Sequence, residues 1–200
     1  MNVRLRKVFE FAAGVVYENK FLINHYTVTV KFTTITSDAA VHGIAYERMC
    51  YWIDQVLFNS ILISDSDPSL QKWLATEQRV IVLPEVPIDQ IVGMLIYSKF
   101  NAIVEEHVII TDVEISSSIG DEVAYLHSEN EHALFLDQPG WWKDSKPSWS
   151  NNNFSKTKGN KVIKINRVPE WKDLELDFDS PIDESQKPVV FVDFTKNDQE

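Results

Sequence analysis

The order in which two residue periodicities follow one another constrains the fold of this chain more than any other feature. Apolar and polar residues alternate over residues 3–11 and again over residues 21–32, where β-branched and aromatic side chains dominate. A period of two residues is typical of strands with one buried face. We interpret residues 14–20 as the connector. The sequence therefore predicts two consecutive strands at the start of the fold.

Helical periodicity follows these strands and then gives way to alternation again. Apolar residues recur at three- and four-residue spacing over about 43–61 and 87–100, which predicts two amphipathic helices. Residues 107–119 alternate once more, and Gly120-Asp121 fits a two-residue turn to a return strand at 122–127. We therefore predict an α+β fold, in which an antiparallel ββααββ sheet carries two helices on one face.

The last third of the chain differs in composition from the rest. Residues 137–160 hold three tryptophans among polar side chains without a clear period, which predicts a long loop. Residues 161–168 and 188–194 fit two late strands, separated by an acidic stretch. We expect a core at residues 1–136 and an extension at 137–200 that packs on the core or on a neighbouring subunit.

Charge and cysteine content narrow the class of protein. The net charge of −11 disfavours binding to duplex nucleic acid, because contacts to phosphate need an excess of lysine and arginine. No window of roughly eighteen residues is uninterruptedly apolar, so we expect no membrane contact through a spanning helix. The single cysteine, Cys50, excludes an internal disulfide and fits a reducing compartment, so we expect a cytoplasmic location.

Several short motifs accompany this order of elements. They are the Phe-x-Phe-Ala-Ala start at Phe9–Ala13, the run Tyr26–Val30, Gly43 before the first helix, and the last hairpin from Val113 to Tyr125. With these motifs the chain resembles, over roughly its first 125 residues, the tunnelling-fold family of 6-pyruvoyltetrahydropterin synthase and 6-carboxytetrahydropterin synthase. The resemblance implies a ββααββ core and a homo-oligomer in which the subunit sheets close into a barrel around a tunnel.

The catalytic groups that this resemblance implies are missing from the matching positions. Enzymes of the family bind zinc with three histidines, and the corresponding positions here are Gly14, Leu22 and Asn24, with His25 one residue late. Because zinc needs several converging ligands, we expect no bound metal and no cofactor. The connector lacks the family's catalytic cysteine, and the position of the family's substrate-anchoring glutamate is occupied by Ser117. The resemblance thus implies a degenerate member without zinc-dependent pterin chemistry.

Five side chains on the predicted strands remain as candidate ligand-binding groups. They are His25, His107, Asp112, Glu114 and Ser117. The two histidines could meet across the sheet, or they are ordinary histidines on polar strand faces.

The tryptophans of the predicted loop form a second candidate site. Trp141, Trp142 and Trp149 lie in a stretch too polar to make a core by itself. Three interpretations stay open: the rings pack on their own domain or a sister subunit, they form a docking site for another protein, or they stack on a base or a sugar.

Two functions follow from these observations. The first is a non-catalytic binding or assembly protein on a scaffold that lacks the zinc site. The alternative is a zinc-independent enzyme, a lyase or hydrolase, that acts on a planar pterin- or purine-like heterocycle at a subunit interface. In that case His25, His107, Asp112 and Glu114 are the candidates for anchoring and proton transfer. A homo-oligomer is expected for either function, because an open sheet exposes edges that neighbours can pair with.

Overall fold

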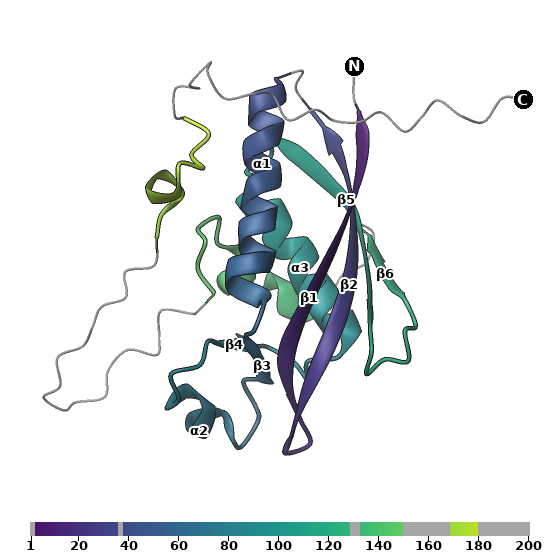
Figure 1. The fold of residues 1–200 in the computed structure, drawn as a ribbon, viewed down its shortest axis with the longest axis vertical. Coiled ribbons are helices and arrows are strands. Elements are labelled where there is room, and N and C mark those ends of the chain that lie inside the picture. Colours follow the sequence, from purple (N-terminus) through teal and green to yellow (C-terminus); the bar gives the residue numbers. More distant parts are fainter. Residues whose placement is uncertain (1–2, 36–37, 129–132, 150–168, 180–200) are drawn as a thin grey trace, which may run out of the picture.

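The computed structural model describes residues 3–35, 38–128, 133–149 and 169–179 (Figure 1). A six-stranded sheet with the order β4-β3-β1-β2-β5-β6 is its central layer. The long helices α1 and α3 lie on one face of this sheet, as the α+β prediction requires.

A long hairpin forms the middle of the sheet. β1 (Arg4–Tyr17) and β2 (Lys20–Thr34) pair antiparallel along their full length. Glu18 and Asn19 join them, and both have left-handed φ angles of 48° and 63°. Two left-handed residues match the twist of the flanking strands, so a two-residue turn suffices. The predicted connector at 14–20 is therefore mostly strand.

The first helix is shifted relative to its prediction over 43–61. α1 (Ala39–Tyr51) begins after Asp38, whose carboxylate accepts a hydrogen bond from the Ala40 amide at 2.9 Å. It continues into a π-helical turn (Trp52–Leu57). The helix then ends, because Phe58 leaves the helical conformation with a ψ of 128°.

Two short parallel strands extend the predicted antiparallel sheet. β3 (Ile61–Ser64) runs parallel to β1, and β4 (Val80–Leu83) runs parallel to β3. The short helix α2 (Leu70–Leu74) connects them. The predicted helix end at about Ile61 is wrong, because the helical turn ends at Leu57 and Ile61 is the first residue of β3. All four residues of β3 are buried. Strands of this kind have no alternation to reveal them.

The second helix and the last hairpin complete the sheet. α3 (Asp89–Ile103) packs on β5 (Val108–Ser117) and β6 (Tyr125–Ser128), which pair antiparallel. The predicted turn at Gly120-Asp121 is instead a longer connection over residues 118–124.

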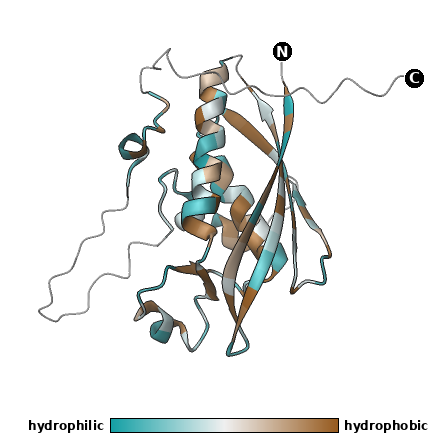
Figure 2. Cartoon of the chain, viewed as in Figure 1, coloured by the Kyte–Doolittle hydropathy of each residue, from teal (hydrophilic) through white to brown (hydrophobic). Residues whose placement is uncertain are grey.

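The hydrophobic core lies between the sheet and the two long helices. Apolar residues on the inner face of the strands meet the apolar sides of the helices, and Figure 2 shows apolar and polar segments changing along the long strands. Central members of this core are Phe11, Tyr26, Val30, Met49, Trp52 and Phe100. The opposite face of the sheet carries the short helix α2 beside β3 and β4, where Leu70 packs with Val16, Ile61 and Ile63. No long helix of the described residues covers the rest of that face (Figure 1), so its side chains there are open to solvent or to a partner.

The predicted late strands at 161–168 and 188–194 lie outside the described residues.

Within the described ranges, no helix combines the length and apolar character that crossing a bilayer would need.

Candidate functional site

The open face of the sheet carries three of the predicted ligand-binding side chains. His25 lies on β2, while Asp112 and Glu114 lie on β5 opposite Lys31 and Thr29. The strand neighbours of these residues are buried against the helices, and successive side chains point to opposite faces. His25, Asp112 and Glu114 therefore share one face, and none of them lines either of the two grooves described below.

The two predicted histidines are far apart. β2 and β5 pair from Tyr26 opposite Ser117 to Thr34 opposite Val108, so His25 and His107 lie at opposite ends of this ladder. The intervening nine residue steps span about 30 Å at the rise of a strand. The ring of His107 instead contacts that of Phe178, with centroids 3.9 Å apart. The two histidines therefore do not form one site.

Ser117 is the predicted residue with the most specific polar environment. It is buried at the end of β5, and its hydroxyl donates to Asp89, with both carboxylate oxygens at 2.8 Å. The amide of Gly120 donates to the same hydroxyl at 3.2 Å. Asp89 is the first residue of α3, where a carboxylate is also favoured by the helix dipole.

Further polar groups gather beside this pair. Asn24 is buried, and its side-chain oxygen accepts hydrogen bonds from the Ser118 hydroxyl and the Ile119 amide, both at 3.0 Å. The buried hydroxyl of Tyr26 has no hydrogen-bond partner within the described residues, and burial raises its pKa. We call Asn24, Tyr26, Asp89, Ser117 and Ser118 the sheet-end cluster.

The carboxylate of Asp89 is the chemically active group of the sheet-end cluster. Burial raises its pKa, and the hydrogen bond from Ser117 opposes part of that rise. A half-buried carboxylate can accept hydrogen bonds from the ring N–H and amino groups of a ligand. Asp89 is not among the residues that the sequence pattern indicated as candidates. Its position just after Pro87, in the first turn of a predicted helix, was a signal for helix capping alone.

The positions that the resemblance assigns to zinc ligands do not fit the metal. Gly14 pairs with Ile23, so a side chain at position 14 would point to the face opposite to Leu22 and Asn24. Gly14 and Leu22 offer no ligand atom, and the Asn24 oxygen already accepts two hydrogen bonds. The described residues contain no group of three potential metal ligands.

The tryptophans of the predicted loop lie against their own chain. Trp141 and Trp142 are buried, and Trp141 donates from Nε1 to the Val82 carbonyl at 2.9 Å and stacks on Trp52 at 5.3 Å. Trp149 is partly buried below the guanidinium of Arg79. The first two rings are therefore core residues of this chain rather than an exposed docking surface.

A buried cation that the sequence analysis did not select holds this loop. Lys99 of α3 has no exposed surface, and its Nζ donates to the carbonyls of Trp141, Asp144 and Lys146 at 3.0, 2.6 and 2.7 Å. A lysine inside a helical apolar stripe gives no local sign of such partners, because they come from a loop more than forty residues away.

Two open grooves lie elsewhere on the surface. One of about 680 Å³ borders the end of α3 and Lys143, and another of about 550 Å³ lies beside the first hairpin, next to Gly14, Phe21 and Trp73. The sheet-end cluster lines neither groove. A ligand at that cluster would therefore need further cover, such as a second subunit.

Comparison with known proteins gives similarity in fold alone. No family model and no curated protein sequence matches the chain. An uncharacterised protein of Wolinella succinogenes is 13% identical, with a TM-score of 0.45 over 64% of this chain and 99% of that one. A catalytic-residue variant of Plasmodium vivax 6-pyruvoyltetrahydropterin synthase is 10% identical, with a TM-score of 0.41 over 64% and 97%.

The corresponding enzyme of Plasmodium falciparum is 16% identical, with a TM-score of 0.38 over 64% of this chain and 96% of that one. Each of these three structures is similar to this chain over about two thirds of its length.

Proposed function

We propose that the protein is a non-catalytic binding or assembly protein that associates with further copies of itself through the edges of its sheet. The unpaired edge of β1 is the observation that carries this proposal. β3 lies beside β1 only at Gly14 and Val15, so no strand among the described residues pairs with the β1 edge from Arg4 to Ala13. An open edge of this length is a template for another strand.

The backbone of β1 has hydrogen-bonding groups directed at this open edge. The Gly14 amide donates to Ser60, and the Ala12 carbonyl accepts from Asn59, both at 2.8 Å on the β3 side. Backbone groups of alternate residues in a strand point to the same side. The N–H and C=O groups of Val8 and Glu10 are therefore directed at the same edge, where a neighbouring strand would satisfy them.

Exposed apolar side chains lie at the turn end of the first hairpin and beside β6. Ile23 on the first hairpin is 66% exposed, and Val123 beside β6 is 70% exposed. Phe21, Ile119 and Leu126 add to these two patches. A head-to-tail contact between β6 of one copy and β1 of the next would pair the open β1 edge and cover the apolar side chains beside β6, and repetition of such a contact closes a ring when the rotation permits.

A proline substitution in β1 tests this edge directly. Val8→Pro removes one N–H from the open edge while the hydrogen bonds between β1 and β2 stay in place, because proline is tolerated on an edge. Val8→Thr keeps the N–H and is the matched control. We expect an oligomer for the wild type and for Val8→Thr, and a monomer for Val8→Pro, by light scattering coupled to size-exclusion chromatography.

Each departure from this pattern would contradict a defined part of the proposal. A wild-type protein that stays monomeric at high concentration would show that the chain does not assemble. An oligomer that survives Val8→Pro unchanged would show that assembly uses another surface. Circular dichroism of both variants checks that the hairpin still forms.

The sheet-end cluster favours a second candidate function, the zinc-independent enzyme or receptor for a pterin- or purine-like heterocycle. Its support is the carboxylate of Asp89, which lies beside Ser117, where the resemblance implies a substrate-anchoring glutamate. A carboxylate in this place could hold the adjacent N–H groups of such a ring by two charge-assisted hydrogen bonds. His25, Asp112 and Glu114 would then face a neighbouring subunit rather than this ring.

A thermal-shift screen of pterins, guanine derivatives and nucleotides tests this second function. We expect a compound that binds at the cluster to raise the melting temperature of the wild type by several degrees and to lose this effect in Asp89→Asn. Asp65→Asn, an exposed change in the loop after β3, is the control and keeps the shift. The absence of any stabilising compound, or an equal shift in Asp89→Asn, would contradict this function.

A further inference from the structure

A short segment of the C-terminal extension, which we call the strap (residues 169–179), is bound to the core through a few anchors. Trp171 is only 6% exposed, and its Nε1 donates to the Ser145 carbonyl at 2.6 Å. Its ring also meets Tyr51 of α1 edge to face, with centroids 5.7 Å apart. A hydrogen bond from the Glu170 amide to Asp173 closes the strap's single turn. The strap thus presents one large aromatic anchor to the core.

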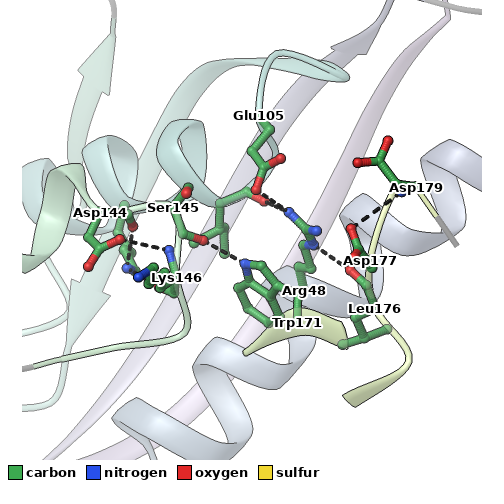
Figure 3. Close-up of polar contacts among 11 residues, drawn as sticks. Arg48, Glu105, Asp144, Ser145, Lys146, Trp171, Leu176, Asp177 and Asp179 are labelled. Carbon is green, nitrogen blue, oxygen red and sulfur yellow. Dashed lines mark hydrogen bonds and ion pairs between the residues drawn. The ribbon is translucent and has the colours of Figure 1, made fainter. Parts of the chain in front are cut away.

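Arg48 of α1 binds the other half of the strap (Figure 3). It is 1% exposed, and its Nε donates to the Leu176 carbonyl at 2.7 Å. A second nitrogen of the guanidinium donates to the Ile103 carbonyl and to Glu105, both at 2.8 Å. The guanidinium also lies 4.8 Å from the ring of Trp171 and 3.9 Å from that of Phe178.

These contacts have the form of a peptide bound in a groove. We call the surface made by Arg48, Tyr51, Glu105, His107 and Ser145 the Arg48 groove. It holds the strap by two aromatic side chains, and by hydrogen bonds that use the backbone of Leu176 and of the groove itself. Buried tryptophan and arginine contacts of this kind carry most of the binding free energy at protein interfaces.

The length of chain before the strap exceeds what binding to its own groove requires. Trp171 donates a hydrogen bond to Ser145. Because Ser145 is four residues from Trp149 and Trp171 is two residues from Pro169, the distance between residues 149 and 169 is at most about 35 Å. The nineteen residues 150–168 can span up to about 65 Å when extended. The same strap can therefore reach a groove on a neighbouring copy.

We propose that the strap is exchanged between copies of this chain, so that the Arg48 groove of one subunit binds residues 169–179 of another. The exchange rests on the assembly proposed above. A strap tethered to its own groove outcompetes the strap of another copy, unless assembly holds that copy close enough to give a comparable effective concentration. The Arg48 groove lies on the helix side of the sheet, away from the open edge of β1, so exchange adds a second link between subunits.

Photocrosslinking in the full-length protein tests the exchange. Phe178→p-benzoylphenylalanine places a photoreactive ring beside Arg48 and His107. Chains labelled with ¹⁵N and unlabelled chains are refolded together in equal amounts, irradiated, and digested for mass spectrometry. Complete exchange predicts that about half of the crosslinked peptide pairs combine one labelled and one unlabelled partner, as random pairing between copies requires.

The controls separate exchange from assembly. The same photoreactive residue at Phe58, which is exposed and outside the groove, should give no crosslink to residues 103–107. Adding Trp171→Ala should remove the crosslinks from position 178. Light scattering on the same samples reports assembly independently. An oligomer with only single-isotope crosslinks would overturn exchange and leave the assembly intact. Single-isotope crosslinks in a monomer would overturn both.

Discussion

The ammonium group of Lys99 exchanges the hydrogen bonds of water for three backbone carbonyls. Its three N–H donors match three acceptors, so every donor is satisfied although the group is completely buried. Burial nevertheless disfavours the charged form and lowers the pKa of Lys99 to about 7, and the negative charge of Asp144 opposes only part of this effect. One residue in the middle of α3 thus couples the position of the loop at 141–146 to a protonation equilibrium.

The stability of the protein should therefore depend on pH through Lys99. The unfolded lysine keeps its proton to about pH 10.5, whereas the folded one loses it near 7. Between these values the unfolded state binds more protons, so the contribution of Lys99 to the free energy of unfolding rises with pH. Relative to Lys99→Met, the wild type should gain a few kcal/mol between about pH 7 and 10 in urea denaturation.

Lys99→Arg is the matched control, because a guanidinium stays charged throughout this range. It should show no such rise relative to Lys99→Met. If the difference in the free energy of unfolding between the wild type and Lys99→Met does not change with pH, the buried ammonium keeps its ordinary pKa.

At the scale of elements, the C-terminal strap depends on one aromatic anchor. Trp171→Ala should lower the free energy of unfolding by about 3 kcal/mol, because it removes a buried ring that contacts Tyr51 and Arg48. Lys172→Ala changes the next residue, whose ion pair with Glu170 is exposed, and should cost less than about 0.5 kcal/mol. Urea denaturation of both variants measures the difference. If Trp171→Ala lowers the free energy of unfolding no more than Lys172→Ala does, the strap adds no stability.

The turn between β1 and β2 offers a gain in stability. Glu18 and Asn19 both have left-handed φ angles, which cost free energy for a glutamate and less for an asparagine. The double change Glu18→Asn with Asn19→Gly introduces the pair that such turns prefer. It should raise the free energy of unfolding by about 1 kcal/mol. A decrease would indicate that this hairpin end is held by other contacts.

The sequence predicted elements whose periodicity is visible and missed one without it. Alternation over 21–32 and 107–119 indicated strands, and the structure has β2 and β5 there. The predicted first helix ended at about Ile61 and no strand was predicted after it, although Ile61–Ser64 forms β3. A strand buried on both faces has the same apolar run as a buried helix turn, so only its neighbours in space distinguish the two.

At the scale of the whole molecule, an acidic protein carries a basic strip at the edge proposed for assembly. Arg4 and Arg6 are exposed on β1, while Asp121 and Glu122 are exposed in the connection that leads to β6. A head-to-tail contact would bring these opposite charges together, although the net charge of −11 opposes association in general.

Reversal of the basic strip should therefore weaken assembly. Arg4→Glu with Arg6→Glu is expected to raise the dissociation constant by about tenfold or more at low ionic strength, and high salt should reduce this effect by screening. Lys72→Glu, an exposed change on α2, is the control. Sedimentation velocity at two salt concentrations measures the result. An unchanged dissociation constant would place the interface elsewhere.

The sequence by itself determined most strands and both long helices, and it placed Gly14, Leu22 and Asn24 where the resemblance implies zinc ligands, because periodicity and residue identity are local properties. Only the tertiary structure decided that Asp89 meets Ser117 across 28 residues, and that Arg48 binds the carbonyl of Leu176 across 128. It also separated His25 from His107, which the sequence allowed to meet. The reason is physical: such contacts depend on strand register and on the direction in which the chain returns, and neither is recorded in the pattern of any single segment.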